Sequence, residues 1–117
     1  MVWIHGGCLL STSGSEPGYS PNKELVRDSH IVHVSFNYRL NAFGFLALAE
    51  LRRLAGNYAL MDELAALKWI QKNIQYFGGD SKKVTLYGQS SGEKSLPILN
   101  HYHNEQHYIT LHYIEFI

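Results

Sequence analysis

The sequence predicts an α/β fold with a mostly parallel sheet and flanking helices, and three observations support this. Short apolar runs rich in β-branched and aromatic residues recur along the chain, as is typical of buried strands. One long stretch between two such runs repeats its apolar residues at three- and four-residue steps, as an amphipathic helix does. A strand, a helix and a strand in that order form a βαβ unit, whose strands are parallel and whose crossover is right-handed.

The first half of the chain contains two expected strands separated by a long loop. The first strand is Val2–Ile4, an apolar run that ends at a His-Gly-Gly sequence. Residues 9–22 are rich in Ser, Gly and Pro and are expected to form a surface loop, and residues 24–28 are expected to form a short helix. Residues 31–38 are mostly β-branched or aromatic and form the second expected strand, whereas residues 41–49 are irregular or form a short helical turn.

The long helix is expected over residues 60–77, where apolar residues recur at helical spacing. Asp62 and Glu63 lie in its first turns, where the helix dipole favours anions. Gly78-Gly79 is expected to end the helix, because glycine adopts the left-handed C-terminal conformation without a Cβ penalty. The third expected strand, Val84–Tyr87, follows directly.

The composition is that of one small globular domain of 117 residues. Ten Lys+Arg balance ten Asp+Glu, so charge gives no support to a nucleic-acid partner or to a polybasic membrane surface. At 45% hydrophobic and 17% charged, the chain is too apolar to be disordered. The single cysteine, Cys8, excludes an internal disulfide and leaves the compartment open. We expect no membrane span, because no run approaches about 20 apolar residues, and the N-terminus lacks a signal-peptide pattern.

Gly88-Gln89-Ser90-Ser91-Gly92 follows the third expected strand directly. It matches G-x-S-x-G, the nucleophile elbow of α/β-hydrolases, in which a serine occupies a tight and strained strand-to-helix turn. Glycines are expected at 88 and 92 because side chains there would collide with neighbouring backbone. The sequence therefore predicts Ser90 as a nucleophile at the carboxyl edge of the sheet.

His5-Gly6-Gly7-Cys8 follows the first expected strand and matches the H-G-G-x oxyanion loop. Its glycines let the backbone approach a substrate carbonyl oxygen closely. The N–H groups of Gly7 and Cys8, together with that of Ser91, are the expected donors to an oxyanion. His5 is expected to shape this loop and not to act as a base.

These motifs, with the segments between them, resemble the type-B carboxylesterases, a family that includes cholinesterases, bacterial and insect esterases, and the non-catalytic neuroligins. The resemblance implies a partial α/β-hydrolase fold and hydrolysis of a small-molecule carboxylic ester through an acyl-enzyme. It implies no cofactor, no metal and no nucleic-acid partner. Many members of the family are secreted, but the compartment and oligomeric state of this protein are left open. The matching residues are Val2–Gly7, Asn37–Leu40, Phe43–Leu46, Gly56, Asn57, Leu60, Asp62, Ala65–Leu67, Trp69, Phe77–Asp80 and Val84–Leu86.

Four positions depart from the family's pattern. Cys8 stands at the usual third glycine of the oxyanion loop, and Gln89 at the usual glutamate before the serine. Glu63 replaces a usual glutamine and Ala59 a usual glycine. A backbone donor survives at Cys8, so these differences are compatible with activity.

The composition changes after Gly92, because residues 93–117 contain no glycine and four of the seven histidines. We therefore expect a partial carboxylesterase domain at 1–92 and an atypical His/Tyr-rich tail at 93–117. In the family the triad acid and histidine lie far downstream of the serine. The chain is thus expected to be an incomplete and inactive fragment, truncated after the elbow. Pro97 would fall inside the next helix of the family, where an interior proline costs about 3 kcal/mol or more.

Three alternatives stay open at this point. The parent protein could be a non-catalytic adhesion module of the neuroligin type, although retention of Ser90 favours an enzyme. The tail could supply an acid–histidine pair from Glu105 with His107 or His112. Its histidines could instead form a metal cluster, but His-rich tracts without cysteine or carboxylate partners are usually incidental. The four histidines are His101, His103, His107 and His112.

Overall fold

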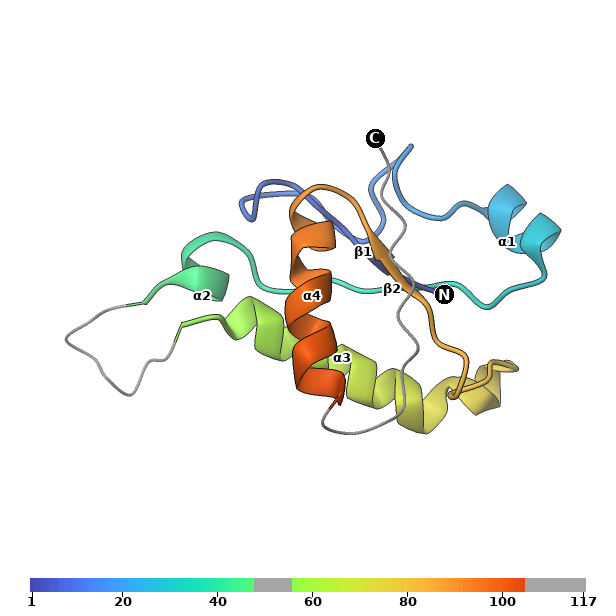
Figure 1. The fold of residues 1–117 in the computed structure, drawn as a ribbon. Coiled ribbons are helices and arrows are strands. Elements are labelled where there is room, and N and C mark those ends of the chain that lie inside the picture. The colour runs from blue at the N-terminus through green and yellow to red at the C-terminus, as the bar shows by residue number, and fades with distance from the viewer. Residues whose placement is uncertain (48–55, 105–117) are drawn as a thin grey trace.

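The protein forms a small parallel sheet with helices packed beside it (Figure 1). The computed structural model describes residues 1–47 and 56–104. The strands are β1 (Val2–Ile4), β2 (Val34–Ser35) and β3 (Leu86–Gly88), in the spatial order β2-β1-β3. β1 is central and pairs in parallel with both neighbours. The α/β class and the parallel pairing are confirmed.

Within the residues that the structure describes, five helical segments connect and flank these strands. The first, α1 (Lys23–Ser29), confirms the expected short helix, and the second, α2 (Asn41–Phe45), the expected helical turn. The long helix is α3 (Tyr58–Asn73), continued by the 3-10 helix η1 (Ile74–Phe77). The last helix, α4 (Ser91–Asn104), directly follows the third strand.

The long helix begins two residues before its expected start and ends where expected. Asn57, in the left-handed region with φ 56°, precedes it, and Gly78, with φ 80°, ends it. Asp62 and Glu63 consequently lie beyond the first turn, which contains no acidic residue. Asp62 instead forms a bidentate ion pair with Arg39, with both N–O distances 2.7 Å. The role of these two acids therefore lies in tertiary contacts and not in the helix dipole.

The second and third strands differ from their expected ranges, because each is limited to the residues that pair with β1. Strand β2 pairs at Val34 and Ser35 alone, since Val2 and Trp3 are the partners available on that side. On the other side, β1 pairs with Leu86–Gly88, so β3 lies later than the apolar pattern predicted. Val84 stays in the core, only 4% exposed, although it lies outside the ladder.

The core lies between one face of the sheet and the helices α3 and α4. Val2, Ile4 and Leu86 are at most 1% exposed, and α4 packs against both β3 and α3. Figure 1 shows α4 crossing α3 on this side of the molecule. Each fully buried aliphatic side chain contributes about 1.5–3 kcal/mol. The buried helix residues that complete this core are Ala59, Leu67, Ile70, Ile74, Leu96 and Leu99.

The other face of the sheet carries aromatic residues. Trp3 and Tyr87 are register partners on β1 and β3, and their ring centroids lie 5.0 Å apart. Strand alternation places them opposite the core-facing aliphatic residues. No helix in the described part of the chain has the length and apolar character needed to cross a bilayer.

Helix α4 crosses the sequence boundary expected at Gly92. It runs from Ser91 to Asn104 and includes Pro97, whose side chain is exposed. Leu96 and Leu99 anchor this helix in the core, which offsets the cost of an interior proline. The division into a domain at 1–92 and a separate tail stays a prediction.

Candidate active site

Ser90 lies in a sharp turn between β3 and α4 and adopts a strained backbone conformation. Its φ is +56°, in the left-handed region that non-glycine residues rarely occupy. Such strain persists only where the surrounding structure holds it, and it is frequent at catalytic sites. The turn places the serine at the carboxyl end of β3, where its side chain is exposed.

The two glycines that flank this turn lie in close contact with backbone. A Cβ on Gly92 would lie 2.3 Å from the Ile4 carbonyl oxygen and 2.5 Å from that of His5. A Cβ on Gly88 would lie 2.8 Å from the carbonyl carbon of Gly92 and 2.9 Å from the Ile4 oxygen. Real Cβ atoms essentially never approach backbone this closely, so a side chain at either position would force the elbow away from β1.

The loop after β1 lies directly against this elbow. A Cβ on Gly6 would lie 2.4 Å from the Gln89 carbonyl oxygen and 3.0 Å from Ser90 Cβ. Gly7 has φ +109°, and the next two residues, Cys8 and Leu9, also have positive φ values of 54° and 64°. This succession of left-handed residues turns the chain sharply at the point where it passes the serine.

The N–H groups expected to bind an oxyanion are unoccupied. Within residues 1–47 and 56–104, none of the backbone N–H groups of Gly7, Cys8 and Ser91 donates a hydrogen bond. The Gly7 carbonyl, in contrast, accepts from the N–H groups of Leu10 and Ser11 at 2.9 and 3.2 Å. The loop is therefore closed through its carbonyl groups and leaves its donors available to a ligand.

A pocket of about 260 Å³ brings the loop and the elbow together. Three of the four residues that carry the expected chemistry line it, and Ser91, the fourth, is buried behind the serine. The lining also contains two aromatic side chains and one carboxylate. The pocket residues are Trp3, His5, Gly6, Gly7, Cys8, Thr12, Glu16, Tyr19, Gln89 and Ser90.

His5 is buried in the wall of this pocket and bonds to its own loop. Its Nδ1 lies 2.9 Å from the Gly6 carbonyl oxygen and 3.1 Å from Thr12 Oγ1. Thr12 in turn donates to the Gly6 carbonyl at 2.6 Å, although its φ is +92°. These contacts support a loop-shaping role for His5.

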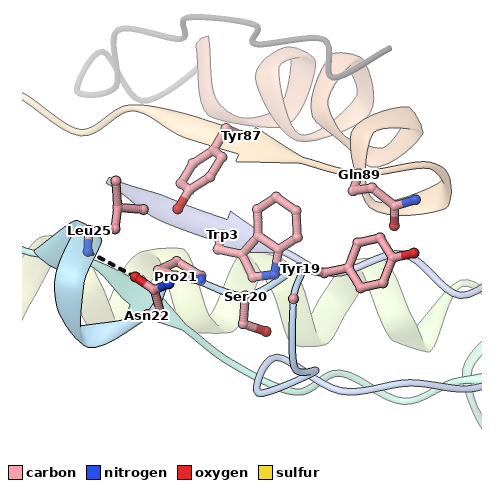
Figure 2. A pocket seen from close by; sticks show the side chains of 9 residues that line it. Trp3, Tyr19, Ser20, Pro21, Asn22, Leu25, Tyr87 and Gln89 are labelled. Carbon is pink, nitrogen blue, oxygen red and sulfur yellow. Dashed lines mark hydrogen bonds between the residues drawn. The ribbon is translucent and has the colours of Figure 1, made fainter.

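A second pocket, of about 530 Å³, adjoins the first and shares Trp3, Tyr19 and Gln89 with it. Figure 2 shows the rings of Trp3 and Tyr87 on neighbouring strands, opposite the loop that contains Pro21 and Asn22. The Asn22 side chain caps α1 by accepting from the Leu25 N–H at 2.8 Å. The Ser90 pocket therefore opens beside an aromatic surface.

Two buried polar residues behind the elbow were not predicted from the sequence. Tyr38 donates its hydroxyl proton to the His5 carbonyl at 2.5 Å and stacks on the His5 ring. Glu63, on α3, is only 1% exposed, and its Oε1 accepts a hydrogen bond from Ser95 Oγ of α4 at 3.3 Å. Burial raises the pKa of the Glu63 carboxyl to about 7. The sequence does contain a signal for the burial of Glu63, because it lies four residues after Ala59 and four before Leu67, on the buried face of α3.

The described residues do not place a triad acid and histidine at Ser90. His5 bonds to its own loop, and His33 contacts Ser29 Oγ at 3.2 Å and the Tyr87 hydroxyl at 3.3 Å. Burial lowers the pKa of His33. The candidate pairs with Glu105, and the side chains of the tail histidines after His101, lie outside the described residues. Among those described, no three His, Cys, Asp or Glu side chains are grouped to hold a metal ion.

Comparison with protein families and curated sequences gives a consistent result. A model described as "Carboxylesterase family" matches residues 1–110. The chain is 45% identical over 100 residues to the para-nitrobenzyl esterase of Bacillus subtilis (strain 168). This alignment covers 85% of this chain and 20% of that protein. It is 46% identical over 96 residues to the acetylcholinesterase of Electrophorus electricus, covering 82% of this chain and 15% of that protein.

Solved structures agree with the sequence comparisons. A thermophilic PNB esterase matches with a TM-score of 0.73 and 42% identity, covering 81% of this chain and 20% of that one. The Geobacillus stearothermophilus carboxylesterase EST55 matches with a TM-score of 0.74 and 41% identity, covering 81% and 21%. The chain thus spans about a fifth of the length of the first curated relatives it matches.

Proposed function

This chain belongs to the carboxylesterase family, and from that premise we propose that it carries the nucleophile and the oxyanion-binding loop of a serine ester hydrolase. Its substrate class is a small-molecule carboxylic ester. One observation carries the proposal: the strained Ser90, with φ +56°, shares a pocket with the Gly6–Cys8 loop, whose free N–H groups are available to a ligand.

The chemistry follows the ordinary course of acyl transfer. Ser90 Oγ attacks the ester carbonyl carbon and loses its proton to a base, giving a tetrahedral oxyanion. Collapse of this intermediate releases the alcohol and leaves an acyl-serine, which water hydrolyses to the acid. The N–H groups of Gly7, Cys8 and Ser91 hold the oxyanion in both steps. Loss of one such donor typically costs about 3–4 kcal/mol of transition-state stabilisation.

We propose further that residues 1–117 alone hydrolyse esters little or not at all. The described histidines with identified partners, His5 and His33, bond away from Ser90 Oγ. A serine without a base retains only the contribution of the oxyanion donors and of substrate binding. In this proposal the whole protein supplies the acid and histidine from residues that do not surround Ser90 here.

A hybrid enzyme tests the proposal without requiring activity of the isolated chain. The matched segment of this chain replaces its counterpart in the B. subtilis para-nitrobenzyl esterase, 45% identical over 100 residues. The hybrid is expected to hydrolyse p-nitrophenyl acetate and to be labelled at Ser90 by a fluorophosphonate. Ser90→Ala should remove both, whereas Ser15→Ala, an exposed serine of the long loop, should change neither.

A folded hybrid that neither hydrolyses the ester nor reacts with the fluorophosphonate would contradict the proposed function. That result would favour the non-catalytic adhesion alternative. Hydrolysis by residues 1–117 alone that disappears in Ser90→Ala would contradict the proposal of an inactive isolated chain.

A further inference from the structure

Tyr38 makes a contact that joins two parts of the candidate site. It follows β2 in the chain and is 6% exposed. Its hydroxyl donates to the His5 carbonyl oxygen at 2.5 Å, a short bond between buried groups. Its ring stacks on the His5 imidazole with a centroid distance of 4.4 Å and an interplanar angle of 19°. Tyr38 thus holds both the backbone and the side chain of His5.

The His5 carbonyl is also where the elbow packs against β1. A Cβ on Gly92 would lie 2.5 Å from this oxygen, so the first turn of α4 lies directly against it. The bond from Tyr38 and the backbone of Gly92 therefore meet at one atom. Any rotation of the His5–Gly6 peptide would move this oxygen relative to the elbow helix.

The orientation of this peptide decides where the oxyanion loop begins. Because a peptide unit is planar, fixing the His5 oxygen also fixes the direction in which Gly6 leaves β1. Gly6 then lies against Gln89 and Ser90, and Gly7 and Cys8 follow in the left-handed turn. Glycines resist rotation less than other residues, so an external anchor is needed to hold such a loop.

The Tyr38 hydroxyl keeps its proton under ordinary conditions. Burial, together with the nearby charge of Glu63, raises the pKa of Tyr38 to about 12. The hydroxyl therefore remains a donor throughout the neutral and mildly alkaline range. Tyr87, a buried tyrosine on β3, has a pKa raised to about 12 by burial, but its hydroxyl contacts His33 and not the loop.

We propose that Tyr38 is a positioning residue: its hydroxyl fixes the His5 carbonyl and thereby sets the oxyanion loop, Gly6–Cys8, relative to Ser90. The catalytic consequence rests on the proposed ester hydrolysis, whereas the structural consequence does not. Tyr38→Phe is the direct test, because it keeps the ring stacked on His5 and removes the hydroxyl that donates to the His5 carbonyl and lies near the Ser91 side chain. Tyr87→Phe is the matched control, since it removes the hydroxyl of another buried tyrosine, on β3, whose partner is His33 and not the loop.

The structural consequence is measured in the full 117-residue chain through its single thiol. Cys8 is exposed and lies within the loop, so its reaction rate with Ellman's reagent reports the freedom of the loop. Tyr38→Phe is expected to raise this rate at least threefold, because the loop samples conformations that open the approach to the sulfur. Tyr87→Phe should leave it within a factor of 1.5. Equal rates in Tyr38→Phe and the parent chain, with native far-ultraviolet circular dichroism in both, would overturn the proposal.

The catalytic consequence is measured in the hybrid esterase. Tyr38→Phe is expected to lower kcat by about 10–100-fold with KM nearly unchanged, because a displaced oxyanion loop affects the transition state more than substrate binding. Tyr87→Phe should keep kcat within twofold. An active hybrid whose kcat does not respond to Tyr38→Phe would overturn the positioning role. An inactive hybrid with Tyr38 present would contradict the proposed function, and the Cys8 rates would still decide the positioning of the loop.

Discussion

Replacing Glu63 with glutamine is expected to stabilise the fold above pH 7 and to change it little below pH 4.5. Glu63 is 1% exposed, and only one of its carboxyl oxygens has a hydrogen-bond partner, the Ser95 hydroxyl. Burial of a carboxylate that has a single hydroxyl partner disfavours its charged form. Burial, with the neighbouring charge of Asp62 adding to it, therefore raises the pKa of Glu63 from 4.5 to about 7.

The sign and size of the effect follow from proton linkage. The unfolded chain ionises Glu63 near pH 4.5, whereas the folded chain retains the proton until about pH 7. The contribution of Glu63 to the free energy of unfolding is therefore most favourable below pH 4.5. It falls progressively as the pH rises through about 7 and does not change above that. A tenfold change in an ionisation constant corresponds to about 1.4 kcal/mol, so the free energy of unfolding falls by about 3 kcal/mol over this range. Glutamine cannot ionise and should avoid this loss while still accepting from Ser95.

Urea unfolding at pH 4.5, 6 and 8, followed by tryptophan fluorescence, to which the buried Trp3 contributes, measures the difference. The free energy of unfolding of the parent chain should fall between pH 4.5 and 8, whereas that of Glu63→Gln should stay within about 1 kcal/mol. Glu24→Gln is the control, since it removes an exposed carboxylate from another helix, α1. A parent chain as stable at pH 8 as at pH 4.5, with Glu63→Gln no more stable at either pH, would refute this reasoning.

Three further outcomes are expected. Gly92→Ala should lower the free energy of unfolding by about 1–3 kcal/mol through overpacking, because its Cβ would lie 2.3 Å from the Ile4 oxygen. Gly78→Ala is the control: a Cβ there meets open space, so with φ +80° it should cost about 1 kcal/mol from backbone strain alone. Pro97→Ala should raise the free energy of unfolding by up to about 3 kcal/mol and increase the helical circular dichroism signal, since Pro97 lies inside α4 with its side chain exposed. Asp62→Asn should cost at most about 1 kcal/mol at pH 7, because its ion pair with Arg39 is partly exposed. Since Arg39 lowers the pKa of Asp62, the difference should shrink as the pH falls below about 4 and disappear below that lowered pKa, and salt should reduce it too.

Local patterns in the sequence predicted the elements that depend on few neighbours. The long helix could be recognised because its apolar spacing persists for many residues, and the glycine that ends it is visible in the chain. The tight turn at Ser90 and the loop after β1 could be located because their backbone shapes demand glycine at particular positions. The α/β class and the carboxylesterase resemblance are confirmed by the family match over residues 1–110 and by the solved structures.

Tertiary contacts decided what the patterns could not. The length of β2 depends on how many residues β1 offers for pairing, which no property of residues 31–38 reveals. The hydroxyl of Tyr38 reaches a carbonyl 33 residues earlier in the chain, and its sequence position shows only a strand-like environment. Glu63 resembles an ordinary acid of a helix surface until α4 packs over it. The roles of Ser90, Gly7, Cys8 and Ser91 stay predictions until the hybrid is assayed.

The central place of β1 in the sheet has a consequence for the synthesis of the protein. β1 precedes both of its neighbours in the chain, and its partner β3 ends at Gly88. At a translation rate of about 5–20 residues per second, β1 waits about 4–16 seconds before β3 emerges from the ribosome. During that interval one edge of Val2–Ile4 is unpaired, and α4, which packs against β3 and α3, has not yet been made. This segment is therefore the expected binding site for a chaperone on the nascent chain, and the loop beside Ser90 takes its shape only after residue 92 has been made.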